Sequence, residues 1–397
     1  AAVTPPEAPE APGVADDRHG ADEEELDGEV LASLDWRWAP YDVLSFWTLA
    51  LPALLLGGIL QALQSIGVPL REVVEDDRVT GLFRDVSPAA GIGLGVLAVA
   101  LVGVVGALAL FVEKWWGFRL VREPGGRLRV RRGLLTARSI SLDEARLRGV
   151  EVARPVLLRA AGGARLRAVT TGLAGAESSR GEGADALMPP APEEVVQRIA
   201  AAVLSEARSP TERPDLRAHP AGARRRRLTR AAVASAVVWA SLGAVVAALD
   251  GVPGAVALVP AAVTAAVLAY ALDAYRSLGH AVTGRYLVVR RGSLSRRTVA
   301  LQRTGVIGWT VRRTVFQRRL GLATIVATTA AGRGAYPLSD VDLGDGLRIA
   351  DRAVPALLGP FLTDQPPAAG GGHPVMPDAG PTTPSTTSTA SRHRRPS

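Results

Sequence analysis

The side chains with the greatest capacity for chemistry in this sequence are arginines that stand in pairs and runs. Two pairs, Arg131–Arg132 and Arg290–Arg291, and a run of four, Arg224–Arg227, each lie close to the end of a long uncharged stretch. The guanidinium group is always charged, and its N–H donors form a fork that matches phosphate and carboxylate oxygens. Beside a membrane, anionic lipid headgroups attract each basic residue with about 1 kcal/mol. The four paired arginines, Arg131, Arg132, Arg290 and Arg291, are therefore candidate contacts for lipid headgroups.

The alternative is that these charges only keep the chain soluble and fix its orientation in a membrane. Both interpretations are compatible with the sequence. A nucleic-acid site is not, because such a site requires aromatic side chains interleaved with basic ones or a recognition motif, and the sequence contains neither. We therefore predict membrane lipids, with anionic headgroups among them, as partners, and no nucleic acid.

The sequence contains no pattern that predicts catalysis. It has no cysteine, and its five histidines lack the spacing of a metal site. It also lacks paired carboxylates on one helix face and the common metalloprotease motif. We therefore predict no catalytic, cofactor-binding or metal site, no cofactor and no enzymatic activity. The histidines are His19, His219, His280, His373 and His393.

Four uncharged stretches predict helices that cross a membrane and position the arginines. The hydrocarbon core of a bilayer is about 30 Å thick, which about 20 helical residues span at 1.5 Å each. Residues 43–66 and 89–112 exceed this length, and residues 231–249 and 255–272 come close to it. The last two stretches are rich in alanine, and they also suit a pair of buried core helices. We predict two transmembrane hairpins, each formed by one pair of stretches.

Tryptophans and charge placement give the predicted hairpins an orientation. Trp36, Trp38, Trp115 and Trp116 flank the first hairpin, where interfacial aromatic anchors are expected. The chain that follows each hairpin is rich in arginine, whereas the loop 67–88 carries more acidic than basic residues. By the positive-inside rule, the arginine-rich segments face the cytoplasm. The sequence thus predicts a multi-pass protein of the cell membrane whose soluble segments are cytoplasmic.

An internal repeat determines the predicted architecture. When the sequence is shifted by 159 residues, Arg127–Gly172 aligns with Tyr286–Ala331 without a gap, and 17 of the 46 positions are identical. The identical positions include glycines and aliphatic residues, which a shared arginine-rich composition would not place at one offset. Such an offset indicates a duplicated unit. Each copy follows its own pair of uncharged stretches, so the repeat consists of a hairpin and a soluble module.

Each module has the pattern of a small antiparallel β structure closed by a helix. Alternating apolar and polar residues predict strands on both sides of the two Arg-Arg-Gly turns, with a bulge between Leu135 and Ile140, where the alternation slips. An amphipathic helix is predicted after Pro192 in the first copy, and another before Gly359 in the second. Several short strands and one C-terminal helix suit a small barrel that the helix closes.

Three motifs, together with the paired uncharged stretches, carry a family resemblance. They are VRRGLLTARSISL at Val130–Leu142, VRRGSLSRRTVAL at Val289–Leu301 and FQRRLGLATI at Phe316–Ile325. On these motifs the chain resembles the bacterial pleckstrin-homology-like (PH) domain membrane proteins of the YdbT type, over about residues 36–362. The first copy departs from the family pattern at Leu157–Leu166. The resemblance implies a PH-like barrel and no settled biochemical activity.

The predicted fold class is an α+β membrane protein. Transmembrane helix hairpins alternate in it with small PH-like antiparallel β-barrel modules, each closed by a C-terminal helix. The two ends of the chain are predicted to be disordered, because they have too few apolar residues to form a core. In chain order the predicted parts are a disordered acidic linker (1–35), hairpin 1 (36–114), module 1 (115–209), a basic linker (210–230), hairpin 2 (231–275), module 2 (276–362) and a disordered tail (363–397).

These features predict a non-enzymatic binding or scaffolding protein of the membrane. Besides lipids, its expected partner is another membrane protein or a second copy of the chain. The alternative is an accessory subunit of a transport or export system. Ionisable residues inside the spans would favour transport, and the four stretches contain none. Because the chain begins with Ala1 and an acidic segment that resembles a linker between modules, we expect a further repeat unit upstream.

Overall fold

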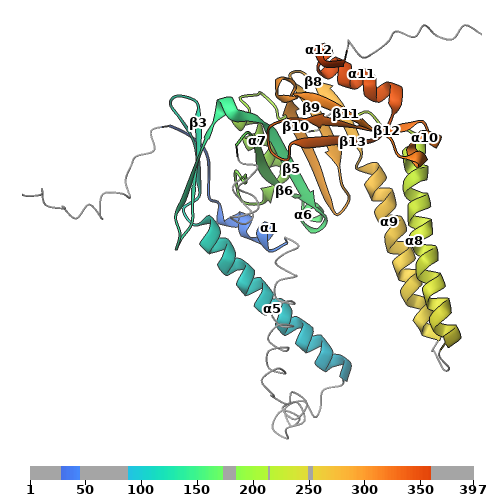
Figure 1. Cartoon of the computed structure of the whole chain (residues 1–397). Helices are drawn as coiled ribbons and strands as arrows, with labels where there is room; N and C mark the ends of the chain where they lie inside the picture. Colours follow the sequence, from blue (N-terminus) through green and yellow to red (C-terminus); the bar gives the residue numbers. More distant parts are fainter. Residues whose placement is uncertain (1–27, 45–87, 173–184, 213–214, 249–253, 359–397) are drawn as a thin grey trace, which may run out of the picture. The chain divides into compact units, whose positions relative to one another are not determined.

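The computed structural model describes residues 28–44, 88–172, 185–212, 215–248 and 254–358 (Figure 1). Almost all of the first predicted span, 43–66, lies outside the described residues, as do the predicted tail 363–397 and most of the linker 1–35. The described chain alternates long helices with groups of short strands, as the repeat predicts.

The first module begins with a strand that the sequence analysis assigned to a linker. β1 (Glu29–Ser33) pairs antiparallel with β2, so the prediction of a disordered linker over 1–35 is wrong for these residues. Short helices η2 (Trp36–Trp38) and α1 (Ala39–Val43) follow the strand, and the long helix α5 (Pro88–Trp115) leads into the rest of the module. Its remaining elements are β2 (Arg119–Glu123), β3 (Arg127–Arg132), β4 (Arg138–Asp143), η3 (Glu144–Arg146), β5 (Leu147–Pro155), α6 (Val156–Ala160), β6 (Gly163–Thr170), β7 (Ala191–Pro192) and α7 (Glu193–Val203).

The second module follows two long helices, α8 (Ala221–Ala248) and α9 (Leu258–Arg276), with η4 (Gly254–Ala257) just before α9. The predicted linker 210–230 is wrong from Ala221 onward, because Arg224–Arg227 are helical and arginine is a good helix former. The module's own elements are β8 (Gly279–Thr283), β9 (Tyr286–Arg291), β10 (Ser295–Gln302), η5 (Arg303–Gly305), β11 (Gly308–Arg312), α10 (Val315–Arg319), β12 (Leu322–Thr328), β13 (Ala335–Asp342), α11 (Leu343–Ala353) and α12 (Pro355–Leu358).

The repeat is present in the structure at the offset that the sequence predicts. β3 and β9, α6 and α10, and β6 and β12 each begin 159 residues apart. The predicted bulge between Leu135 and Ile140 is wrong, because β3 and β4 pair without a register shift from Arg132↔Arg138 onward. The slip in alternation arises because residues 133–137 are the turn between the two strands.

One sheet joins the two modules. Its strand order is β7-β6-β5-β10-β9-β8, so β5 of the first module pairs antiparallel with β10 of the second, from Pro155↔Ser295 to Gly149↔Leu301. A Cβ atom at Gly149 would lie only 2.0 Å from the backbone oxygen of Ala300, so glycine permits this close approach. The other sheets are β1-β2-β3-β4 in the first module and β11-β12-β13 in the second.

Two hydrophobic cores lie mainly in one module each, and the first also includes Ala281, Tyr286, Val288 and Ala300 of the second module. In β3, Leu128 and Val130 are buried while Arg129 and Arg131 are half-buried, the alternation of a strand with one face on a core. The helices α7 and α11 bury an apolar face each in these cores, with Val196 and Ile349 among the buried side chains. The helix predicted before Gly359 is interrupted, because α11 ends at Ala353 and Pro355 begins α12.

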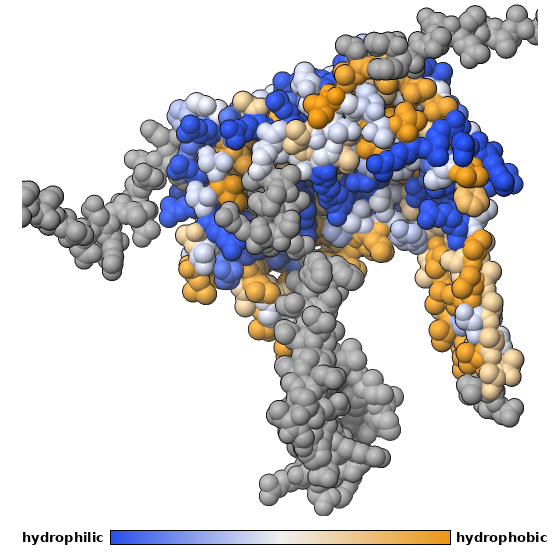
Figure 2. Space-filling view, viewed as in Figure 1, coloured by the Kyte–Doolittle hydropathy of each residue, from blue (hydrophilic) through white to orange (hydrophobic). Residues whose placement is uncertain are grey.

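The long helices present apolar side chains to the outside. α8 packs against α9, and the indole N–H of Trp239 donates a hydrogen bond to the hydroxyl of Thr264 at 3.2 Å. Figure 2 shows hydrophobic residues over most of the visible surface of this helix pair, where Val233 and Leu258 are exposed. Within the described residues, α8 and α9 are the helices long and apolar enough to cross a bilayer, judged by length and composition alone.

Candidate membrane-facing site

In both modules, the turn after the paired arginines is bound to the end of a long helix. In the first module, the backbone N–H groups of Gly133 and Leu134 donate to the carbonyl oxygens of Trp116 and Glu113, both at 2.9 Å. These bonds satisfy carbonyl groups at the end of α5 that have no partner within the helix. The β3–β4 turn is therefore fixed at the point where α5 joins the module.

The second module fixes the corresponding turn through side chains. The hydroxyl of Ser293 donates to the carboxylate of Asp273 near the end of α9, at 2.7 Å. The Arg290 guanidinium donates to the carbonyl oxygens of Ser277 and Arg276, at 3.3 and 3.4 Å. A cation at a helix C-terminus is also favoured by the helix dipole. The β9–β10 turn thus lies beside the end of α9, as the β3–β4 turn lies beside the end of α5.

Each of these turns carries a leucine with a largely exposed side chain. Leu135 in the first turn is 84% exposed, and Leu294 in the second is 69% exposed. The two leucines occupy the same position of the repeat. Leu134, beside Leu135, is exposed as well. Both turns therefore present an apolar side chain to the outside of the module at the same position of the repeat.

The structure places the four candidate arginines at these junctions but gives them different surroundings. Arg132 is only 4% exposed, and its guanidinium lies 4.4 Å from the centre of the Trp115 ring. Burial lowers the pKa of Arg132, although an arginine keeps its charge at any physiological pH. Arg131, Arg290 and Arg291 are half-buried. These three arginines therefore have more surface available to a headgroup than Arg132.

The four predicted tryptophan anchors also divide into two pairs. Trp36 and Trp116 are about half exposed, and their rings meet edge to face with centroids 5.7 Å apart. Trp38 and Trp115 are buried in the core of the first module. The structure therefore leaves Trp36 and Trp116 as the candidates for an interfacial anchor.

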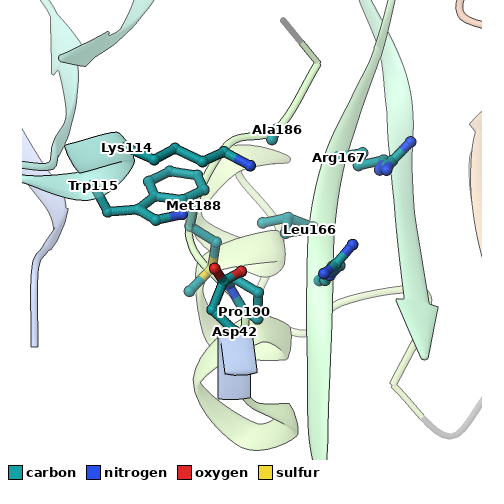
Figure 3. Close-up of a pocket in the computed structure, with 9 residues that line it drawn as sticks. Asp42, Lys114, Trp115, Leu166, Arg167, Ala186, Met188 and Pro190 are labelled. Atoms are coloured by element: carbon teal, nitrogen blue, oxygen red, sulfur yellow. The ribbon is translucent and has the colours of Figure 1, made fainter. Parts of the chain in front are cut away.

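A small cavity lies beside the end of α5. Figure 3 shows Lys114 and Trp115 on one side of it and Leu166 and Arg167 of β6 on the other. Its volume is about 30 Å³, which suits water-sized groups and is far below the several hundred Å³ of a cofactor pocket. Arg167 also forms an ion pair with Asp185 at 3.5 Å. This cavity lies close to the site but has no room for an organic ligand.

The structure brings together three clusters of charge that sequence reasoning missed. Asp273 of α9 accepts hydrogen bonds from Arg159 of the first module and Arg296 of the second, at 3.3 and 3.1 Å. The signal in the sequence was an aspartate directly after the uncharged stretch 255–272. Its contact with another module could not be predicted, because Arg159 lies far from it along the chain.

In the other two clusters, the carboxylate belongs to a strand and is buried. Asp340 of β13 accepts from Arg226 of α8 at 2.5 Å and is almost fully buried. Glu151 of β5 accepts from Arg297 and Arg333 of the second module, at 3.3 and 3.1 Å. Burial raises the pKa of the Glu151 carboxyl, and the arginines oppose this shift. These contacts connect a long helix to a module and the two modules to each other.

The described residues contain no group of three or more histidine, cysteine, aspartate or glutamate side chains that could hold a metal ion. His219 and His280 form a buried pair of imidazoles with ring centroids 5.0 Å apart. Two imidazoles alone fall short of the ligand sets that proteins use for structural or catalytic zinc.

The duplicated module, built from antiparallel sheets and closed by a helix, defines a protein of the PH-like class. The family model for the bacterial PH domain matches residues 51–207 and 231–355, which is most of the chain. The chain belongs to the bacterial PH domain family. The match confirms the family resemblance and the repeat, whereas membership of the YdbT type stays a prediction.

No curated protein and no solved structure matches the chain significantly. PH domains are generally binding modules without catalytic activity.

Proposed function

We propose that this chain is a multi-pass membrane protein whose two PH-like modules lie against the cytoplasmic face of the membrane and act there as non-enzymatic binding and scaffolding domains. One observation carries the proposal. In both modules, an exposed leucine stands on a turn that is fixed to the end of a long apolar helix, as Leu135 does beside α5 and Leu294 beside α9.

The position of these turns supports contact with lipid. A helix that crosses the bilayer ends in the headgroup region, so a turn bound to its last residues lies at the same depth. Full burial of a leucine side chain is favourable by about 1.5–3 kcal/mol. Arg131, Arg290 and Arg291 can add about 1 kcal/mol each if they reach anionic headgroups. Two such turns in one chain would hold both modules against the membrane surface.

The sequence of the long helices supports the spanning arrangement and its orientation. α5 contains the uncharged stretch 89–112, and α8 and α9 contain the stretches 231–249 and 255–272. Arg224–Arg227 stand at the start of α8 and Arg276 at the end of α9, so the positive-inside rule places these two ends in the cytoplasm. In this arrangement α8 and α9 form one hairpin, and α5 is the second helix of the other.

The test uses single cysteines in a chain that has none of its own. An environment-sensitive dye is attached to Leu135→Cys, Leu294→Cys or the control Arg127→Cys in the full chain in lipid nanodiscs. Arg127 lies at the other end of β3, six residues or about 20 Å from the turn. We expect shorter emission wavelengths and quenching by lipid-borne quenchers at 135 and 294 but not at 127. Equal, water-like emission at all three positions would refute the proposal.

Orientation is tested separately, by labelling intact cells with a reagent that cannot cross the membrane. Asp76 and Gly251 belong to the predicted external loops, and Gly175 and Gly332 belong to the predicted modules 115–209 and 276–362. We expect labelling of the first two only. Labelling of Gly175→Cys or Gly332→Cys from outside would contradict the cytoplasmic placement of the modules.

A further inference from the structure

Strand β10 of the second module and strand β4 of the first occupy the same position of the repeat but have different neighbours. β10 pairs with β9 on one side and with β5 on the other, whereas in the described chain β4 pairs with β3 alone. β4 therefore presents an open edge at the place where the second module has accepted a strand. An unpaired edge is a template for a further strand.

The filled edge shows what chemistry such a strand needs. Glu151 of β5 is only 4% exposed, stands opposite Val299 of β10, and accepts a hydrogen bond from Arg297 on the same face of that strand. Gly149 allows the backbone of β5 to approach Ala300 closely. The β10 edge has thus accepted a strand that carries a glycine and, two residues later, a carboxylate.

The open edge repeats the receiving side of this arrangement. Arg138 and Leu142 of β4 stand at the positions of Arg297 and Leu301 and are identical to them. Ile140 stands at the position of Val299, which is the residue opposite the carboxylate. Arg138, Ser139 and Ser141 are exposed. β4 therefore has the open backbone edge, the arginine and the two aliphatic residues that β10 uses to receive β5.

We propose that the β4 edge is a docking site for an extended strand of another PH-type module, which adds antiparallel to β4 and places a carboxylate opposite Ile140 and diagonal to Arg138. This is strand addition to an exposed sheet edge, in which backbone hydrogen bonds give affinity and side chains give specificity. The β5–β10 contact within the chain is the precedent for its register.

A second copy of this chain is a poorer occupant. β5 of a second copy is already paired with its own β10, so of the two strands at this position of the repeat, the one that keeps a free edge is β11. At the position of Glu151, β11 has Thr310, and Arg312 would stand directly opposite Arg138. Like charges directly opposite each other destabilise a strand pair. The charge pattern therefore favours a different module that carries an acidic residue at this position.

The probe is a fluorescent peptide with the sequence of β5, LRGVEVARP, added to the full chain in nanodiscs. We expect binding that weakens about tenfold when the peptide's glutamate is replaced by arginine, or when the chain carries Arg138→Glu, because each change puts like charges together. The two changes combined restore binding. The matched control, Arg127→Glu, removes an exposed arginine at the far end of β3 and leaves the affinity unchanged.

A cross-link checks the register independently of affinity. By analogy with Val152↔Thr298, a peptide with cysteine in place of its second valine should form a disulfide with the Ser139→Cys chain and not with Arg127→Cys. Absence of peptide binding, or binding that ignores Arg138, would overturn the proposal. Tighter binding of a β11 peptide, VIGWTVRRT, would overturn it in favour of contact between copies of this chain.

Discussion

At the junction between long helix and first strand, the two modules place different side chains at equivalent positions. Val130 of β3 and Val289 of β9 occupy the same position of the repeat. Leu120 of β2 lies opposite Val130, and His280 of β8 lies opposite Val289. Leu120 lies in an apolar core, whereas His280 packs edge to face on His219. In the same register, Trp115 of the first module corresponds to Tyr275 of the second. The Arg132 guanidinium lies over the Trp115 ring, whereas the Tyr275 hydroxyl donates to the carbonyl oxygen of His219 at 3.0 Å.

The difference teaches that the two turns keep the same place at a helix end through different interactions, backbone hydrogen bonds in the first module and side-chain hydrogen bonds in the second. In the first module, backbone N–H groups bind the end of α5, and the core behind them is apolar and aromatic. In the second, Ser293 and Arg290 supply the hydrogen bonds, and buried imidazoles replace part of the apolar core. We expect the first junction to be sensitive to lost volume and the second to be sensitive to acid.

Loss of the Trp115 ring should have the largest effect on the first junction. Trp115 is 1% exposed in the core of the first module, whereas Trp116 is 45% exposed. Trp115→Ala should lower the free energy of unfolding by about 3–5 kcal/mol because it leaves a large cavity. Trp116→Ala should lower it by less than about 1 kcal/mol. Denaturant unfolding in detergent measures both, and equal effects would mean that burial does not separate the two residues.

Two glycines at the same position of the repeat should differ nearly as much. Gly149→Ala places a Cβ 2.0 Å from the Ala300 backbone oxygen, so β5 and β10 must separate locally, at a cost of about 2–3 kcal/mol. Gly308→Ala in β11 meets nothing within 4 Å and should change stability by at most about 0.5 kcal/mol. Thermal unfolding of the two variants side by side is the measurement. A Gly149→Ala chain as stable as Gly308→Ala would contradict the sheet shared by the modules.

Acid should weaken the second junction. Burial lowers the pKa of His219 and of His280 to about 4; the neighbouring imidazole adds to the shift of His219, and Arg217 adds to that of His280. Asp340 and Asp345 act in the opposite direction. Because the unfolded chain takes up these protons more readily, stability is complete above about pH 6.5 and is lost as the pH falls towards 4. At pH 5 the loss should be about 2 kcal/mol for each histidine.

The measurement compares unfolding at pH 7.5 and pH 5 for the native chain and for the His219→Gln, His280→Leu double variant. The variant has leucine at position 280, as the first module has at Leu120. Its acid loss should be smaller than that of the native chain by the contribution of the two histidines. The same acid loss in both chains would show that other groups are responsible.

The smallest expected effect concerns the acidic residue near each helix end. Asp273 and Glu113 occupy equivalent positions of α9 and α5, and both are half-buried. Asp273 accepts hydrogen bonds from three side chains. Asp273→Asn should lower stability by about 1 kcal/mol, since the partners are partly solvated. Glu113→Gln should change it by less than about 0.5 kcal/mol. If the two variants lose the same stability, the Asp273 cluster contributes nothing beyond an ordinary surface charge.

Much of the module could be predicted from the sequence, because strands such as β3 alternate strictly and one offset aligns the two copies. β1 was missed because Glu29–Ser33 is short and has one β-branched residue, and the start of α8 was missed because a run of arginines resembles a linker. The sequence predicted that the arginine pairs lie near helix ends. It could not predict that Arg132 is buried on Trp115, because burial depends on the tertiary packing of the module.

The shared sheet could not be predicted either, for a related reason. β5 and β11 correspond in the repeat and share a glycine position, Gly149 and Gly308, yet only β5 pairs with a strand of the other module in the described chain. Between the modules, Glu151 accepts hydrogen bonds from Arg297 and Arg333, which lie 146 and 182 residues away from it along the chain. A single sequence contains the residues of such a contact but not their proximity.

Asp273 connects the end of α9 to both modules. The residue lies near the end of a 19-residue helix, about 28 Å long, and binds Arg159 of one module and Arg296 and Ser293 of the other. A spanning helix responds to the thickness of the surrounding bilayer by changing its tilt. If α9 spans the membrane as proposed, a change of tilt moves a carboxylate that both modules share. A change in bilayer thickness would then reach both modules together, through the hydrogen bonds of Asp273.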